Sequence, residues 1–79
     1  MTKRLPEKRW TDKGGGTTRR RFSRRVEAEV FYAGTSYTAR IWVGVDFTNR
    51  HGYATPGAAK IAATAVATRL VSNARRTKG

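Results

Sequence analysis

The chain has 79 residues, with 17 Lys and Arg against 5 Asp and Glu and a formal net charge of +12. This length builds one domain at most, and the absence of cysteine excludes disulfides, thiolate metal sites and a cysteine nucleophile. No apolar run approaches the ~20 residues that span a bilayer, and no secretory signal precedes the first basic residues, so we expect a cytoplasmic protein without a membrane partner. Such an excess of positive charge predicts a polyanionic partner.

Residues 1–18 are rich in Lys and Arg, contain Pro6 and include the glycine run 14–16. Proline and glycine interrupt regular structure, and few apolar residues are present to form a buried face. We therefore predict a flexible basic arm with a glycine hinge. Trp10 is the exception within it, and we expect a solvated or loosely docked aromatic ring there.

Two segments, 20–32 and 37–47, alternate between apolar and polar residues, and a turn signal at 33–36 separates them. Alternation with a period of two is typical of half-buried strands. A hairpin that places Tyr32 opposite Tyr37 matches apolar with apolar residues along one whole face, and a shift of one residue would mix the faces. On the second face, this register places Glu29 opposite Arg40, an expected ion pair.

Residues 48–52 form a second cluster of turn residues, which we expect to lead into a short third strand around Tyr53. Thr55 suits the cap of a helix and Pro56 its first position. Alanine dominates residues 57–74 and favours helix. One stripe has spacings of three and four, and its members are Ala59, Ala62, Ala63, Val66 and Leu70.

The predicted fold class is α+β, with a three-stranded antiparallel sheet packed on one C-terminal helix and a disordered basic N-terminal arm. The expected boundaries are 1–18 for the arm, 19–75 for the sheet and helix, and 76–79 for a basic tail.

Catalytic groups are scarce in this sequence. His51 is the single histidine, and Glu27 and Glu29 are the only carboxylates close together along the chain. Both glutamates have basic neighbours, and nothing nearby favours the raised pKa of a general acid. One histidine and scattered acids do not make a metal ligand set. We therefore expect no enzyme, no catalytic residue, no cofactor and no metal.

The second face of the predicted hairpin combines arginines with Trp42. Guanidinium groups bind phosphates or guanine edges, and an indole packs along sugars or bases, so this combination is typical of nucleic-acid binding. The alternative is that Trp42 is covered by the arm or by a partner subunit. The candidate nucleic-acid-binding residues are Arg19, Arg20, Arg21, Arg24, Arg25, Arg40 and Trp42, with Lys3, Arg4, Lys8 and Arg9 in the arm.

Two short motifs resemble a known family. Residues 25–30, Arg-Val-Glu-Ala-Glu-Val, and 40–44, Arg-Ile-Trp-Val-Gly, resemble two strands of the DNA-binding domain of plant ethylene-response factors. The lead into the helix at 53–55 is similar there and in the arm-binding domains of tyrosine recombinases. The resemblance implies a three-stranded sheet whose arginines and tryptophan contact the major groove. The corresponding residues here are Arg19, Arg21, Arg25, Arg40 and Trp42.

A second resemblance is to a domain that binds RNA. Residues 59–63, Ala-Lys-Ile-Ala-Ala, resemble the last helix of the double-stranded-RNA-binding domain. That family has lysines directly before this motif, whereas this chain has Gly57 and Ala58 at those positions. Residues 1–18 also offer no first helix. This resemblance therefore ranks second.

We expect a double-stranded DNA-binding protein that reads or coats the duplex with its sheet face while the arm follows the phosphates. One alternative is binding of structured or double-stranded RNA. Another is a small interaction protein that self-associates through Trp42, Ile61 and Val71 or binds an acidic protein. Small size and Arg- and Ala-rich composition favour a phage or plasmid accessory protein, nucleoid-associated if bacterial, within a nucleoprotein complex.

Overall fold

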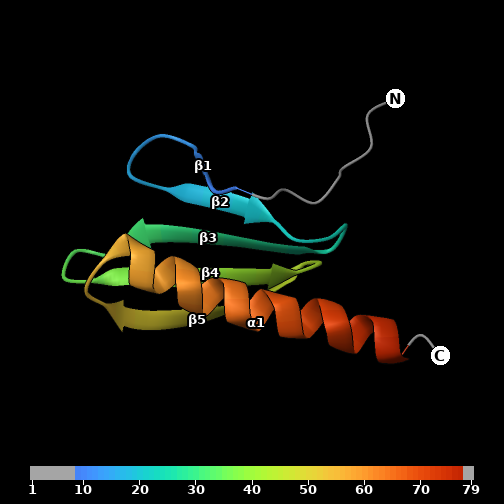
Figure 1. Cartoon of the computed structure of the whole chain (residues 1–79). Helices are drawn as coiled ribbons and strands as arrows, with labels where there is room; N and C mark the ends of the chain where they lie inside the picture. The colour runs from blue at the N-terminus through green and yellow to red at the C-terminus, as the bar shows by residue number, and fades with distance from the viewer. Residues whose placement is uncertain (1–8, 78–79) are drawn as a thin grey trace.

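The computed structural model describes the fold of residues 9–77, and side chains up to residue 73. An antiparallel sheet of five strands in chain order carries one long helix on one face (Figure 1). The elements are β1 Thr11–Asp12, β2 Thr18–Arg21, β3 Val26–Tyr32, β4 Tyr37–Val43, β5 Asp46–Tyr53 and α1 Pro56–Thr77.

The central hairpin of β3 and β4 has the predicted register. Tyr32 pairs with Tyr37, Val26 with Val43 and, on the second face, Glu29 with Arg40. One face is buried beneath α1 and the other faces away from it, which is why a shift of one residue is not tolerated. The hairpin prediction is confirmed.

The prediction of three strands with a disordered arm is wrong, because β1 and β2 add a second hairpin. The glycine run is its turn: Gly14, Gly15 and Gly16 all have positive φ, a conformation that glycine adopts without steric cost. Asp12 accepts a hydrogen bond of 2.8 Å from the Gly14 backbone, and the Lys13 amide donates to the Thr17 carbonyl at 2.8 Å. A run that is typical of linkers here closes a hairpin.

The expected single strand over 20–32 is also interrupted. β2 ends at Arg21, and β3 begins at Val26. In the loop between them, Ser23 Oγ accepts hydrogen bonds from the backbone amides of Arg25 and Val26, at 3.3 and 3.1 Å. The arginines of residues 19–25 therefore lie partly on a strand and partly in an ordered loop.

The turn after β4 lies earlier than expected. Gly44, with φ of +64°, and Val45 connect β4 to β5, and the expected turn cluster 48–52 lies within β5. Val45 is 88% exposed instead of facing the core. Phe47 lies opposite Trp42, on the face away from the helix. The alternation of residues 37–47 continues through Gly44 in the sequence, which concealed the turn.

Small side chains bring α1 close to the sheet. The Thr55 hydroxyl accepts a hydrogen bond of 3.1 Å from the Ala58 amide, which confirms the predicted cap. The buried core consists of Val26, Ala28 and Val30 of β3, Ala39 and Ile41 of β4, and Ala59, Ala63 and Ala67 of α1. The predicted stripe contains two of these three helix residues and omits Ala67. Val71 packs against this core, whereas Ile61 is 74% exposed.

Trp10 packs on the side of the sheet that α1 covers. Its ring packs edge-on against Phe22 with centroids 6.2 Å apart, and the Lys60 ammonium lies 6.0 Å from its centroid. Both aromatic side chains are partly buried against the core. Trp10 is thus part of the fold and not of the candidate site.

Candidate nucleic-acid interface

The sheet face opposite α1 is here called the outer face. Strand registers place every second residue of each strand on it, and the buried residues alternate onto the helix side. In the described residues its members are Thr11 of β1, Arg19 and Arg21 of β2, Glu27, Glu29 and Phe31 of β3, Thr38, Arg40 and Trp42 of β4, and Phe47, Asn49 and His51 of β5.

A ladder of ion pairs crosses β2, β3 and β4 on the outer face. Arg19 contacts Glu29 at 3.0 Å, Arg21 contacts Glu27 at 3.3 Å, and Arg40 lies 3.9 Å from Glu29. The hydrogen bond that Arg19 donates to Glu29 raises the pKa of Arg19, and the charges of both glutamates act in the same direction, although burial opposes them. Three arginines against two glutamates leave this ladder with one excess positive charge.

Arg40 is held within the protein on three sides. Its guanidinium carbon lies 5.1 Å from the Phe31 ring centroid and 4.9 Å from that of Phe47, and its Nε donates a hydrogen bond of 2.8 Å to Asn49 Oδ1. A planar guanidinium stacks on aromatic faces in this way. Arg40 therefore lies on the predicted face, but its Nε and its planar group are already engaged within the protein.

Trp42 extends this arrangement into a continuous row of contacting side chains. Its ring centroid lies 4.7 Å from that of Phe47, and it is partly buried on the outer face and not within the core. The order Phe31, Arg40, Phe47, Trp42 gives a contiguous strip across β3, β4 and β5. Phe47, which sequence reasoning placed in the core, is 51% exposed and is the most accessible ring of the strip.

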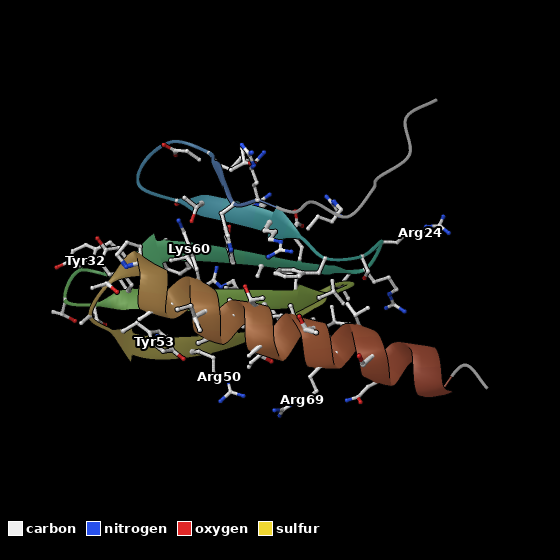
Figure 2. All side chains as sticks on the ribbon, in the orientation of Figure 1. Arg24, Tyr32, Arg50, Tyr53, Lys60 and Arg69 are labelled. Carbon is white, nitrogen blue, oxygen red and sulfur yellow. The ribbon has the colours of Figure 1, made fainter. Side chains whose placement is uncertain are left out.

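The other predicted site residues are dispersed. Arg20 lies on the helix side, 4.4 Å from the Phe22 ring centroid. Arg24 and Arg25 are exposed in the loop between β2 and β3, and Figure 2 shows Arg24 projecting from that end of the sheet. Arg9 is exposed beside the sheet. Lys3, Arg4 and Lys8 lie outside the described residues.

Two further exposed arginines were not predicted as site residues. Arg50 of β5 and Arg69 of α1 both project outward on the β5 side of the molecule (Figure 2). Arg50 was missed because residues 48–52 resemble a turn, and Arg69 because it follows no pattern beyond the polar side of a helix. Positive charge is therefore also present beyond the outer face, on the β5 side of the molecule.

The acid–base and metal chemistry of the described residues is limited. His51 Nδ1 lies 3.1 Å from the Thr38 hydroxyl, a hydrogen bond across β4 and β5 that occupies this ring nitrogen. Across residues 9–77, no three His, Asp or Glu side chains come together as a metal site requires. Within the same part of the chain, no helix is long and apolar enough to cross a membrane.

Comparison of this chain with protein-family models, with curated proteins and with solved structures finds no match.

Proposed function

We propose that this protein binds duplex DNA, with the outer face lying across the phosphate backbone. The observation that supports this most is the contiguous strip of three aromatic rings and the Arg40 guanidinium on a sheet face that no element of residues 9–77 covers, in a chain of net charge +12. Arginine and aromatic groups on one accessible surface suit the charge and the flat sugar and base surfaces of nucleic acid. The proposed setting is the cytoplasm, and the nucleoid if the source is bacterial.

The geometry favours coating the duplex over reading its bases. The four strands β2 to β5 span about 14 Å between their outer axes at ~4.8 Å per strand, whereas the major groove is about 12 Å wide. Side chains widen the sheet further. The outer face as a whole is therefore too broad to insert into the groove, unlike the three-stranded sheet that the family resemblance implies.

The contacts that the arginines make within the protein also favour coating the duplex over reading its bases. Base reading requires a guanidinium fork that is free to pair with a guanine edge. Arg40 is occupied by Asn49 and two rings, and Arg19 by Glu29. Phosphates need only nearby positive charge, which Arg24 and Arg25 supply at the end of the sheet. We therefore propose binding with little sequence preference.

A pair of variants that each remove one positive charge tests this proposal. Arg19→Ala removes a charge from the outer face, and Arg69→Ala removes one from the exposed side of α1. Affinity for a labelled duplex is measured by fluorescence anisotropy over a series of salt concentrations. We expect Arg19→Ala to weaken duplex binding at every salt concentration, because it leaves Glu29 without its partner on the outer face, and we expect Arg69→Ala to change binding little.

The opposite ranking of the two variants would refute binding through the outer face. A duplex RNA of matched sequence is titrated in parallel. Tighter binding to the RNA than to the DNA at equal salt would replace the proposed ligand with double-stranded RNA, the alternative suggested by residues 59–63.

A second candidate is the binding of unpaired nucleic acid, which the accessibility of Phe47 favours. Base stacking on an exposed ring is worth ~1–3 kcal/mol per base and needs no groove. The variant Trp10→Phe leaves Trp42 as the only indole, so its fluorescence reports on the strip. Strong quenching by a single-stranded oligonucleotide, with weaker quenching by the duplex, would favour this candidate over the first.

A further inference from the structure

The strand β5 is an unpaired edge of the sheet. It lies last in the strand order within residues 9–77, and it has eight mostly exposed residues, whereas the opposite edge strand, β1, has two. A long exposed edge presents unpaired amide and carbonyl groups and is a template for another strand. β5 is therefore a position at which another strand can pair with this sheet.

The stretch of β5 that can accept a regular partner is short and well defined. It begins at Asp46, directly after the turn of Gly44 and Val45. It ends at Arg50, because Ala39 pairs with Arg50 but Tyr37 pairs with Tyr53, so β5 has one extra residue there. Such a bulge disrupts regular pairing. The regular stretch is therefore residues 46–50, with Thr48 at its centre.

The turn also determines which backbone groups face outward. A two-residue loop with glycine at positive φ in its first position is a type II′ turn, closed by a hydrogen-bonded pair. Here the loop begins with Gly44, and that pair is Val43 and Asp46. Hydrogen bonding alternates along an antiparallel strand, so the backbone groups of Phe47 and Asn49 point away from β4. They are the groups that a new strand must meet.

We propose that a second copy of this chain pairs with β5 in antiparallel orientation, with Thr48 facing Thr48 of the second copy on a two-fold axis. This register places Phe47 opposite Asn49 of the second copy as a hydrogen-bonded pair. It also places Asp46 opposite Arg50 of the second copy, twice by symmetry. Every residue of the regular stretch 46–50 is then paired.

Charge selects this register among those that the backbone allows. Neither Asp46 nor Arg50 has an ion-pair partner among the described residues. A shift of the second strand by two residues either way would place Asp46 opposite Thr48 or Gly52 and lose both cross-strand pairs. Opposite charges facing each other across strands stabilise pairing, so the self-complementary register is favoured.

The dimer has a consequence for the candidate interface. The two-fold axis is perpendicular to the sheet, so both helices lie on one side and the two outer faces join on the other. The resulting surface is twice as wide as that of one copy. This inference stands on β5 alone and does not depend on what the outer face binds.

A single cysteine on the two-fold axis tests the register. Residues opposite each other in a non-hydrogen-bonded antiparallel pair have Cα atoms about 4.5 Å apart, within the disulfide range of about 4.4–6.8 Å. The chain has no cysteine of its own, and Thr48 is exposed. Thr48→Cys is compared with Thr68→Cys, a matched exposed position on α1, under mild oxidation at equal protein concentration.

We expect Thr48→Cys to form the covalent dimer at least about ten-fold faster than Thr68→Cys, because pairing holds the two thiols within bonding range. Equal rates would overturn the proposal. Sedimentation of the cysteine-free chain must also show a dimer whose fraction rises with concentration, and a monomer at all concentrations would overturn it as well.

Exchange of the two charges provides an independent test. Asp46→Arg and Arg50→Asp should each weaken self-association about ten-fold, because each replaces both attractive pairs with repulsive ones. The double variant restores opposite charges in reversed order and should recover the dimer. Circular dichroism verifies that each variant is folded. A double variant that associates as weakly as the single ones would refute the register.

Discussion

Replacing Arg40 with alanine should destabilise the fold more than removal of any exposed arginine. Arg40 stacks on Phe31 and Phe47, at 5.1 and 4.9 Å from their centroids, and donates to Asn49 at 2.8 Å. Each stack at a partly exposed site contributes ~0.5–1 kcal/mol, and the hydrogen bond contributes about 1 kcal/mol. The pair with Glu29 at 3.9 Å adds little. We expect Arg40→Ala to lower the free energy of unfolding by about 2–3 kcal/mol.

Urea unfolding followed by circular dichroism measures this loss, with Arg69→Ala as the control for one lost charge. An exposed arginine that contacts no described acid should change stability by less than ~0.5 kcal/mol. Arg40→Lys retains the charge but not the planar group, so it should remain destabilised. If Arg40→Ala is as stable as Arg69→Ala, the stack does not hold the outer face together and the reasoning fails.

Three other substitutions have definite expected results. Ala63→Leu overfills the contact between α1 and the sheet, where Ala63 is 0% exposed, and should cost ~1–3 kcal/mol in urea unfolding; Ala65→Leu, at an exposed helix position, is the control, and an equal loss there would contradict close packing. Thr55→Ala removes the cap and should cost about 1 kcal/mol, so an unchanged unfolding midpoint would argue against it. Arg24→Ala should leave stability unchanged and reduce the salt slope of duplex binding by about 0.9, and an unchanged slope would exclude Arg24 as a phosphate contact.

The central hairpin and the helix were predictable because local signals agree with the tertiary fold. In β3 and β4, a shift of one residue mixes polar with apolar residues, and the turn signal at 33–36 selects the observed register among those that keep the faces apart. Thr55 and Pro56 identify the start of the helix. The small residues on its buried side follow the helical period, although Ala67 was missed among many alanines.

The edge strands were not predictable for different reasons. Two residues, Thr11 and Asp12, are too few to show alternation, and a glycine run favours a linker as readily as a hairpin turn. On the other side, Gly44 interrupts an apolar alternation that continues to Phe47 in the sequence, so β4 and β5 resemble one long strand. Both errors concern where the chain reverses, which depends on backbone conformation more than on side-chain pattern.

The candidate site was predictable in its composition but not in its contacts. Alternation places Arg21, Arg25 and Arg40 on one face, and the structure agrees for Arg21 and Arg40 but places Arg25 in the loop between β2 and β3. The Arg40–Glu29 pair follows from the predicted hairpin, but the engagement of Arg19 and Arg21 by Glu29 and Glu27 depends on β2 lying beside β3, a pairing that the sequence does not reveal. The stack around Arg40 depends in the same way on the position of β5.

The central claim is that nucleic acid contacts the outer face. Heteronuclear NMR spectra of the labelled chain, recorded with and without a short DNA duplex, test it most directly. We predict that the largest shifts occur at the Trp42 indole and at the amides of Arg19 and Phe47, and that Ile61 and Ala65 on the exposed side of α1 remain unchanged. Shifts confined to α1, with the Trp42 signal unmoved by saturating duplex, would contradict the account.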